Sequence, residues 1–253
     1  MIIDSHCHID FEDFDTDRDE VLQRAQIADI SKIIVPGVTR MTWQRVKSTC
    51  QQYPQLYPCY GLHPYFIDQH NENDLLALKH QLLDDDKTVA IGECGLDFFL
   101  NHLDRKKQHA YFEQQLDLAI EFNLPVVVHA RKSTEAVITA IKKRPGLRGM
   151  IHSYSGSYEQ AIQLISLGFY LSFGGPITYD KATRLHKLVK SLPLSSLLIE
   201  TDAPDQAVAK SKSQRNEPAC IIDVATHIAQ LHNIELNELT SATTRNAEML
   251  FAL

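Results

Sequence analysis

The sequence predicts a single (β/α)8 barrel, the TIM-barrel architecture, extending over residues 1–253. Three observations favour it. The length is normal for one α/β barrel, eight short apolar runs recur along the chain, and a helical pattern follows each run. Several runs are continuously apolar, as expected for parallel strands that are buried on both faces. An open, doubly wound sheet is the alternative, but eight strands favour the barrel.

The elements follow one another without a linker or repeat. The predicted strands are MIID (1–4), KIIVPG (32–37), YPCYGLH (57–63), TVAIGECG (88–95), PVVVHA (125–130), GMIHS (149–153), FYLSFGG (169–175) and LLIETD (197–202). Amphipathic stretches lie between them, for example 105–123 and 157–168. The second begins with Ser157 and Gln160 in capping-box spacing and ends at Gly168. The longest irregular stretch, 203–218, follows the eighth strand.

Composition and charge indicate a soluble globular enzyme. The chain is 44% hydrophobic and 23% charged, and its net charge is -7, so a broad attraction to nucleic acid or an anionic membrane is not expected. Its 5 cysteines include no CxxC pair, which favours reduced thiols in the cytosol. We see no signal peptide and no apolar run of about 20 residues. We therefore expect a cytoplasmic protein with no membrane contact and no obligate protein partner.

Polar residues gather where the predicted strands end, which is where barrel enzymes carry their chemistry. In chain order these residues are His6, His8, His63, Glu93, His129, His152, Glu200 and Asp202, with Asp97 just beyond the fourth strand. Residues two apart in a strand point the same way, so His6 and His8 share a face and Cys7 points away. Cys94 alternates away from Glu93 in the same manner, and we interpret both cysteines as packing residues.

These side chains predict a metal site as a group. Imidazoles and carboxylates are common ligands of Zn²⁺ and other transition metals, and carboxylates also suit Mg²⁺ and Mn²⁺. Four histidines and two carboxylates exceed one tetrahedral site and suffice for two metals that share a carboxylate. Each residue alone has a structural alternative. Glu93 could pair with an arginine, His129 and His152 could be hydrogen-bonded core histidines, and Asp202 could cap a loop.

Six segments in this order and spacing resemble the TatD family of metal-dependent deoxyribonucleases. They are SHCHID, GLHP, IGECGLD, VVVHAR, IHSYSG and ETDAP, and the resemblance extends from the second residue to the RNEP segment near position 217. It implies a barrel of the metallo-dependent hydrolase type and a hydrolase of DNA, often a 3′→5′ exonuclease, with divalent metal as cofactor. The chain has TDAPD where other members have TDSP, and this departure at Asp205 bears on substrate preference.

The resemblance also implies a role for each ligand. His6, His8 and Asp202 would hold one metal, His129 and His152 would hold the second, and Glu93 would bridge them. His63 resembles the family's phosphate-contacting histidine. The expected cofactor is therefore two divalent ions (Zn²⁺, Mg²⁺ or Mn²⁺), and the expected substrate is DNA, as single strands or 3′ ends.

Other roles follow from position in the chain. Asp202 could accept a proton from the attacking water as a general base, beside Glu93, which would set the metal spacing. Arg131 lies two residues past His129 and could bind phosphate with His63, or it could be a solvated loop arginine. Glu200 shares a face with Asp202, so we expect it to support that carboxylate by hydrogen bonding.

Two glycines and one basic loop each have two interpretations. Gly174 and Gly175 could form a phosphate site or a turn. The basic residues Lys210, Lys212 and Arg215 in the long loop could steer a nucleic-acid backbone. We favour a solvated segment for this loop.

Other classes of function share parts of this pattern. A metallohydrolase of small-molecule esters or amides would use the same ligands. Relatives that bridge metals with a modified lysine, and Schiff-base aldolases, need a lysine at a strand end, and no predicted strand ends in one. A binding protein with a vestigial site would not need every ligand, and here every ligand is present.

Overall fold

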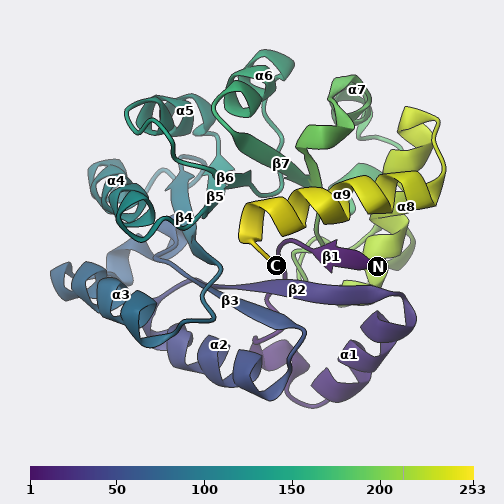
Figure 1. Cartoon of the computed structure of the whole chain (residues 1–253). Coiled ribbons are helices and arrows are strands. Elements are labelled where there is room, and N and C mark those ends of the chain that lie inside the picture. Colours follow the sequence, from purple (N-terminus) through teal and green to yellow (C-terminus); the bar gives the residue numbers. More distant parts are fainter. Residues whose placement is uncertain (213) are drawn as a thin grey trace. The chain divides into compact units, whose positions relative to one another are not determined.

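The computed structural model describes residues 1–212 and 214–253 and contains the predicted alternation of strands and helices (Figure 1). The strands are β1 (Ile2–Asp4), β2 (Ile30–Gly37), β3 (Leu56–Tyr60), β4 (Ala90–Asp97), β5 (Val126–Arg131), β6 (Gly149–Ile151), β7 (Phe169–Phe173) and β8 (Leu197–Ile199). They form one sheet in chain order, and the registered pairs are parallel. The predicted (β/α)8 fold class is confirmed.

Helices connect the strands. They are α1 (Arg18–Ile27), α2 (Arg40–Gln52), α3 (Glu72–Asp84), α4 (Arg105–Phe122), α5 (Thr134–Lys142), α6 (Tyr158–Ser166), α7 (Thr183–Ser191), α8 (Ile221–His232) and α9 (Leu236–Phe251). Short 3-10 helices are η1 (Glu12–Phe14), η2 (Pro64–Gln69), η3 (Gly175–Thr178), η4 (Leu194–Ser196), η5 (Ala209–Ser211) and η6 (Pro218–Cys220). Of the described helices, none is long and apolar enough to span a bilayer.

The chain divides into two compact units. The first contains residues 1–35, 153–158 and 170–253, and the second contains 36–152 and 159–169. The prediction of a single domain over 1–253 stays a prediction, and each unit is described by itself below.

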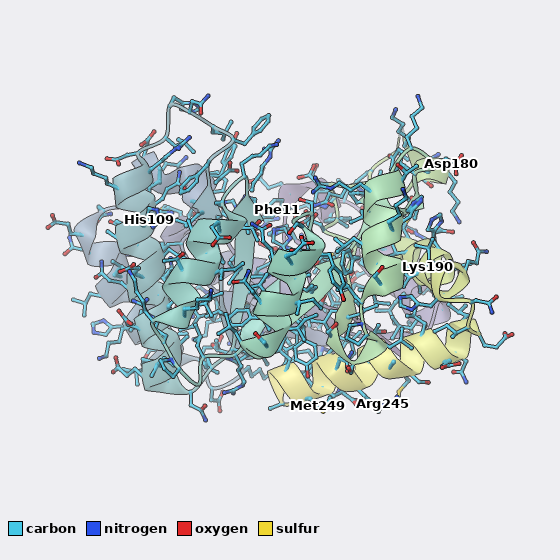
Figure 2. The ribbon with its side chains drawn as sticks, turned by 90° about the horizontal axis from the view of Figure 1, so that it is seen from above. Phe11, His109, Asp180, Lys190, Arg245 and Met249 are labelled. Atoms are coloured by element: carbon cyan, nitrogen blue, oxygen red, sulfur yellow. The ribbon has the colours of Figure 1, made fainter. Side chains whose placement is uncertain are left out.

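In the first unit, β1 pairs with β2 and β7 pairs with β8. The amide of Ser5 donates to the carbonyl of Ile199 at 3.1 Å, which ties the chain after β1 to the end of β8. Helix α9 contacts both β1 and β8 and buries Leu239, Ala247 and Leu250, whose spacing is helical. Its opposite face carries the exposed Arg245 and Met249 (Figure 2).

In the second unit, α4 fixes the ends of two strands through two buried glutamines. Gln108 accepts from the amide of Asp97 and donates to its carbonyl, at 2.9 and 3.1 Å. Gln115 does the same for Leu62, at 2.7 and 3.1 Å. Because buried backbone groups need partners, these bonds hold the segments after β3 and at the end of β4 in place.

Strand β4 has the predicted length but lies two residues later in the chain, at 90–97 and not 88–95. It continues to Asp97, so Glu93 lies inside the strand and not at its end. The register of β4 against β5 shifts between Ile91 and Cys94, around Glu93. Such irregularities re-aim a side chain within a strand.

Candidate metal centre

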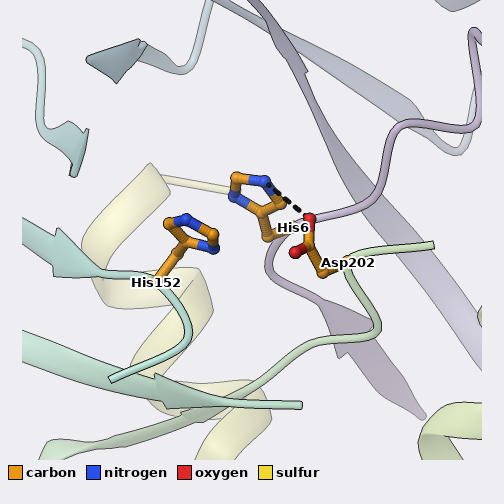
Figure 3. A group of neighbouring side chains, drawn as sticks. All are labelled: His6, His152 and Asp202. Atoms are coloured by element: carbon orange, nitrogen blue, oxygen red, sulfur yellow. Dashed lines mark ion pairs between the residues drawn. The ribbon is translucent and has the colours of Figure 1, made fainter. Parts of the chain in front are cut away.

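The first unit brings together three predicted ligands, His6, His8 and Asp202. The Nε2 atoms of the two histidines lie 3.2 Å apart. Asp202 Oδ1 lies 3.3 Å from His6 Nε2 and 3.6 Å from His8 Nε2, and the contact with His6 is drawn in Figure 3. The prediction that alternate residues would point the same way after β1 is confirmed, and Cys7 between them is buried.

Asp4 holds this set in position. Its Oδ1 accepts from the amides of His6 and Thr201, at 3.2 and 3.0 Å, and its Oδ2 accepts from the Thr201 hydroxyl at 2.6 Å. Asp4 is completely buried, and burial raises its pKa to about 7 although these hydrogen bonds oppose the rise. Sequence reasoning missed Asp4, and the signal was an acid at the end of an otherwise apolar strand.

Two further residues orient the first set. The Gln206 side-chain amide donates to Asp202 Oδ2, which leaves Oδ1 as the oxygen beside the histidines. The ring of Phe11 stacks on that of His8, with centroids 4.5 Å apart. Sequence reasoning missed both contacts, although each joins residues only three or four positions apart.

The second unit gathers Glu93, His129 and His152, the other predicted ligands. Glu93 Oε1 lies 2.9 Å from His152 Nε2 and 3.3 Å from His129 Nδ1. The two ring nitrogens lie 3.2 Å apart. One carboxylate oxygen and two imidazole nitrogens therefore converge on one point.

Asp97 sets the orientation of His129. Its Oδ2 lies 3.1 Å from His129 Nε2, which fixes the ring so that Nδ1 faces Glu93 Oε1. Burial lowers the pKa of His129, but the hydrogen bonds with Asp97 and Glu93 outweigh it and raise the pKa above its usual value. Burial conversely raises the pKa of Asp97, and the bond from His129 outweighs it, so Asp97 is ionised.

His63 also contacts Glu93. Its Nδ1 accepts from the amide of Tyr65 at 3.1 Å, which places the proton on Nε2, and Nε2 lies 2.9 Å from Glu93 Oε1. Burial lowers the pKa of His63 to about 4, against the opposing effect of the Glu93 carboxylate. The neutral ring therefore donates to Glu93, and its predicted phosphate contact stays a prediction.

Both sets fit a divalent metal. Two ligand atoms bound 2.0–2.1 Å from a tetrahedral metal lie about 3.3 Å apart. In the first set the separations are 3.2 to 3.6 Å, and in the second they are 2.9 to 3.3 Å. The donors are imidazole nitrogens and carboxylate oxygens, which suit Zn²⁺ and Mn²⁺. The donor atoms of His63, Glu93 and His129 also lie within 4.8 Å of one another.

Comparison with known proteins gives the family. The family model described as TatD related DNase matches residues 3–252. The chain belongs to the TatD family.

Named relatives and solved structures agree with this assignment. The chain is 38% identical over its whole length to the uncharacterized metal-dependent hydrolase YabD of Bacillus subtilis, whose whole length is also covered. It is similar to the crystal structure of the TatD homologue YjjV from Escherichia coli, with a TM-score of 0.95, 35% identity, and 100% and 98% of the two chains covered. A TatD family hydrolase from Entamoeba histolytica has a TM-score of 0.89 and 25% identity over 99% and 97%. The family and the two donor sets make the chain a metal-dependent hydrolase.

Two further predicted residues of this TatD protein, Glu200 and Arg131, have contacts that the structure defines. Glu200 Oε1 accepts from the amide of Ser153 at 2.6 Å. Glu200 thus orders the segment after β6, while the carboxylate of Asp202 takes its hydrogen bond from Gln206. Arg131 is exposed, and its guanidinium lies 3.8 Å from the centre of the Phe99 ring.

Two basic residues of the long loop after β8 form ion pairs with acidic residues of the chain. Lys210 pairs with Asp223 at 2.7 Å, and Arg215 pairs with Asp17 at 2.6 Å and lies over the Phe14 ring. These pairs favour a structural role over backbone steering. Asp205, where the chain has TDAPD and other family members have TDSP, is exposed. Partial burial of its carboxyl and the charge of the neighbouring Asp202 raise its pKa.

The remaining candidates have structural roles. A Cβ on Gly175 would lie 1.8 Å from the carbonyl oxygen of Gln206, so this glycine permits a close backbone contact that seats the Asp202 partner. Cys7 and Cys94 are buried and their thiols face backbone carbonyls, as expected of packing residues.

Proposed function

We propose that this TatD protein is a metal-dependent deoxyribonuclease that hydrolyses phosphodiester bonds at single strands or 3′ ends. The observation that carries the proposal is the pair of donor sets. Each unit holds one set of imidazole nitrogens and carboxylate oxygens at metal-ligand spacing. Two metals suit phosphodiester hydrolysis, because they can stabilise both the attacking and the leaving oxygen of the displacement.

The two sets would act as one binuclear centre. His6, His8 and Asp202 would hold one metal and His129 and His152 the other. Glu93 would bridge them, because its carboxylate has a second oxygen beyond the one that contacts the histidines. In the (β/α)8 fold the carboxyl ends of all strands lie on one face, and every ligand lies at or near such an end.

The side chains of the site would then have separate roles in the reaction. Bound divalent metal supplies a lowered pKa for an attacking water and polarises phosphoryl oxygens. Asp202, held by Gln206, would accept the proton from the water. His63 and Arg131 would hold the non-reacting phosphate oxygens, and Arg131 has the charge and the exposure for this role.

The cellular setting that we propose is the cytoplasm, without an obligate protein partner. The five cysteines are free thiols, and four of them are buried, as is usual where thiols stay reduced.

A substrate comparison tests the function. Metal-free protein is reconstituted with Mn²⁺, Zn²⁺ or Mg²⁺ and assayed on single-stranded DNA, blunt duplex, RNA, and small esters and amides. We expect cleavage of single strands to exceed that of the closed duplex. Asp202→Asn should lower single-strand cleavage by roughly 10²- to 10⁴-fold, since it removes a general base. Cys7→Ser, a matched change between two ligands, should leave the rate unchanged.

Two results would refute the proposal. One is activity confined to small esters or amides, which would assign the site to a small-molecule hydrolase. The other is wild-type turnover by Asp202→Asn at full metal occupancy, which would remove Asp202 from the mechanism.

A further inference from the structure

An exposed aromatic–cation pair lies next to the second donor set. Phe99 is 51% exposed although it is a large apolar side chain. The Arg131 guanidinium covers one face of its ring at 3.8 Å. Among the described residues the Arg131 guanidinium has no hydrogen bond or ion pair, so its N–H donors are available. A guanidinium that stacks by its face can still bind phosphate through its edge.

The backbone joins this pair directly to the metal ligands. Asp97 accepts from the amide of Phe99 at 2.9 Å through Oδ1 and contacts His129 at 3.1 Å through Oδ2. Asp97 is also the register partner of Arg131 across β4 and β5, and the amide of Phe98 donates to the carbonyl of Arg131 at 2.8 Å. The same carboxylate therefore fixes His129 and the aromatic residue.

The neighbouring ring has a different role. Phe98 is covered by the Arg105 guanidinium at 4.7 Å and by the His109 ring at 5.6 Å. It packs the start of α4, whereas half of Phe99 is left to solvent. An exposed aromatic ring beside the second donor set offers a ligand a face on which to stack.

The surroundings are basic although the chain as a whole is acidic. Arg105 and Lys106 are exposed at the start of α4, Lys132 is exposed just after β5, and the net charge of the chain is -7. Such local positive charge complements a polyanion, and an aromatic face complements a base, which every nucleotide presents.

We propose that Phe99 and Arg131 form a nucleotide-stacking platform, on which one unpaired base of a single-stranded nucleic acid stacks on Phe99 while the adjoining phosphate binds Arg131. This inference rests on the proposed function for the identity of the substrate. It explains a preference for single strands, because a base that is paired and stacked in a duplex cannot lie on the ring.

Equilibrium binding tests the platform independently of cleavage. The probe is a phosphorothioate-linked hexanucleotide that contains 2-aminopurine, added to the metal-loaded protein. Phe99→Ala should weaken binding about 5- to 150-fold, the range found for loss of one stacked base. Phe99→Tyr, which keeps the ring, should restore binding. Ile120→Ala is the matched control, since Ile120 is also exposed but lies 15 residues along α4 from Arg105, about 22 Å away.

An abasic hexanucleotide of the same charge separates stacking from electrostatics. Phe99→Ala should leave binding of the abasic probe unchanged. Arg131→Gln should weaken both probes alike and reduce the slope of log affinity against log salt by about 1. Metal content and far-UV circular dichroism verify that each variant is folded.

Three results overturn the platform. The first is that Phe99→Ala binds the 2-aminopurine probe as tightly as the wild type. The second is that Phe99→Ala weakens binding of the 2-aminopurine and abasic probes equally. The third is that the wild type binds neither probe. Binding that depends on Phe99 without any cleavage would refute the proposed function alone. Cleavage of DNA with no effect of Phe99→Ala on binding would refute the platform alone.

Discussion

Asp97 shows at the scale of one residue how a ligand is prepared for a metal. An imidazole can present either nitrogen, and only a partner on the far nitrogen decides which one. Asp97 supplies that partner for His129 although the two are 32 residues apart in the chain, because the pairing of β4 with β5 brings them together.

Replacement of Asp97 tests this role. Asp97→Asn keeps the shape but removes the charge that favours the Nε2 proton of His129. We expect the affinity of the second donor set for metal to fall about 10- to 100-fold, as is usual for such outer partners. Competition with a chelating dye measures it. Asp104→Asn, a change of the exposed cap of α4, is the control, and equal affinities of the Asp97 and Asp104 variants would contradict the role.

The sequence predicted the members of the two donor sets better than the residues that hold them in position. Positions at strand ends predicted His6, His8 and Asp202 as neighbours, and the structure brings them together. It did not predict the contacts of Asp4 or Gln206. A candidate ligand is recognised from the chemistry of its own side chain, whereas a supporting residue is recognised only from its hydrogen bonds, such as that from Thr201 to Asp4, 197 residues away in the chain.

At the scale of elements, β4 depends on glycine where it passes His129. Gly95 has a φ of 140°, and a Cβ there would lie 2.0 Å from the carbonyl oxygen of His129. The backbone of the strand approaches its neighbour too closely for any side chain. The close pairing of β4 with β5 at the second donor set therefore requires this residue.

A pair of matched glycine variants tests the element. Gly95→Ala should destabilise the fold by about 2–6 kcal/mol, the sum of backbone strain and overpacking. Gly146→Ala is the control, since Gly146 has a φ of 87° but no atom within 4 Å of the added Cβ. It should cost about 1–2 kcal/mol. Urea unfolding at equal metal occupancy measures both, and equal losses would refute the close-contact explanation.

Element boundaries were less predictable than element types. The eight strands were anticipated, but the extension of β4 to Asp97 was not, because Gly95 normally marks the end of a strand. Helix α9 was also not anticipated. Its threonines and alanines give a weak apolar period, and contacts with β1 and β8 make it a buried helix.

At the scale of the whole molecule, net charge was a poor guide to the substrate. The net charge of -7 argues against a broad nucleic-acid surface, yet the start of α4 and the segment after β5 carry exposed basic residues. Binding follows the local field, so an acidic protein can still bind a polyanion at one edge. Sequence composition averages over this arrangement and cannot reveal it.

The most direct test of the central claim, that the two donor sets form one binuclear hydrolytic centre, is a titration of metal-free protein with Mn²⁺. Bound metal per chain and cleavage of a single-stranded oligonucleotide are measured in the same samples. We predict two bound ions per chain, cleavage that rises with the second ion, and loss of that cleavage in Glu93→Gln. Full cleavage by the metal-free protein, or a maximal rate with one ion bound, would contradict the claim.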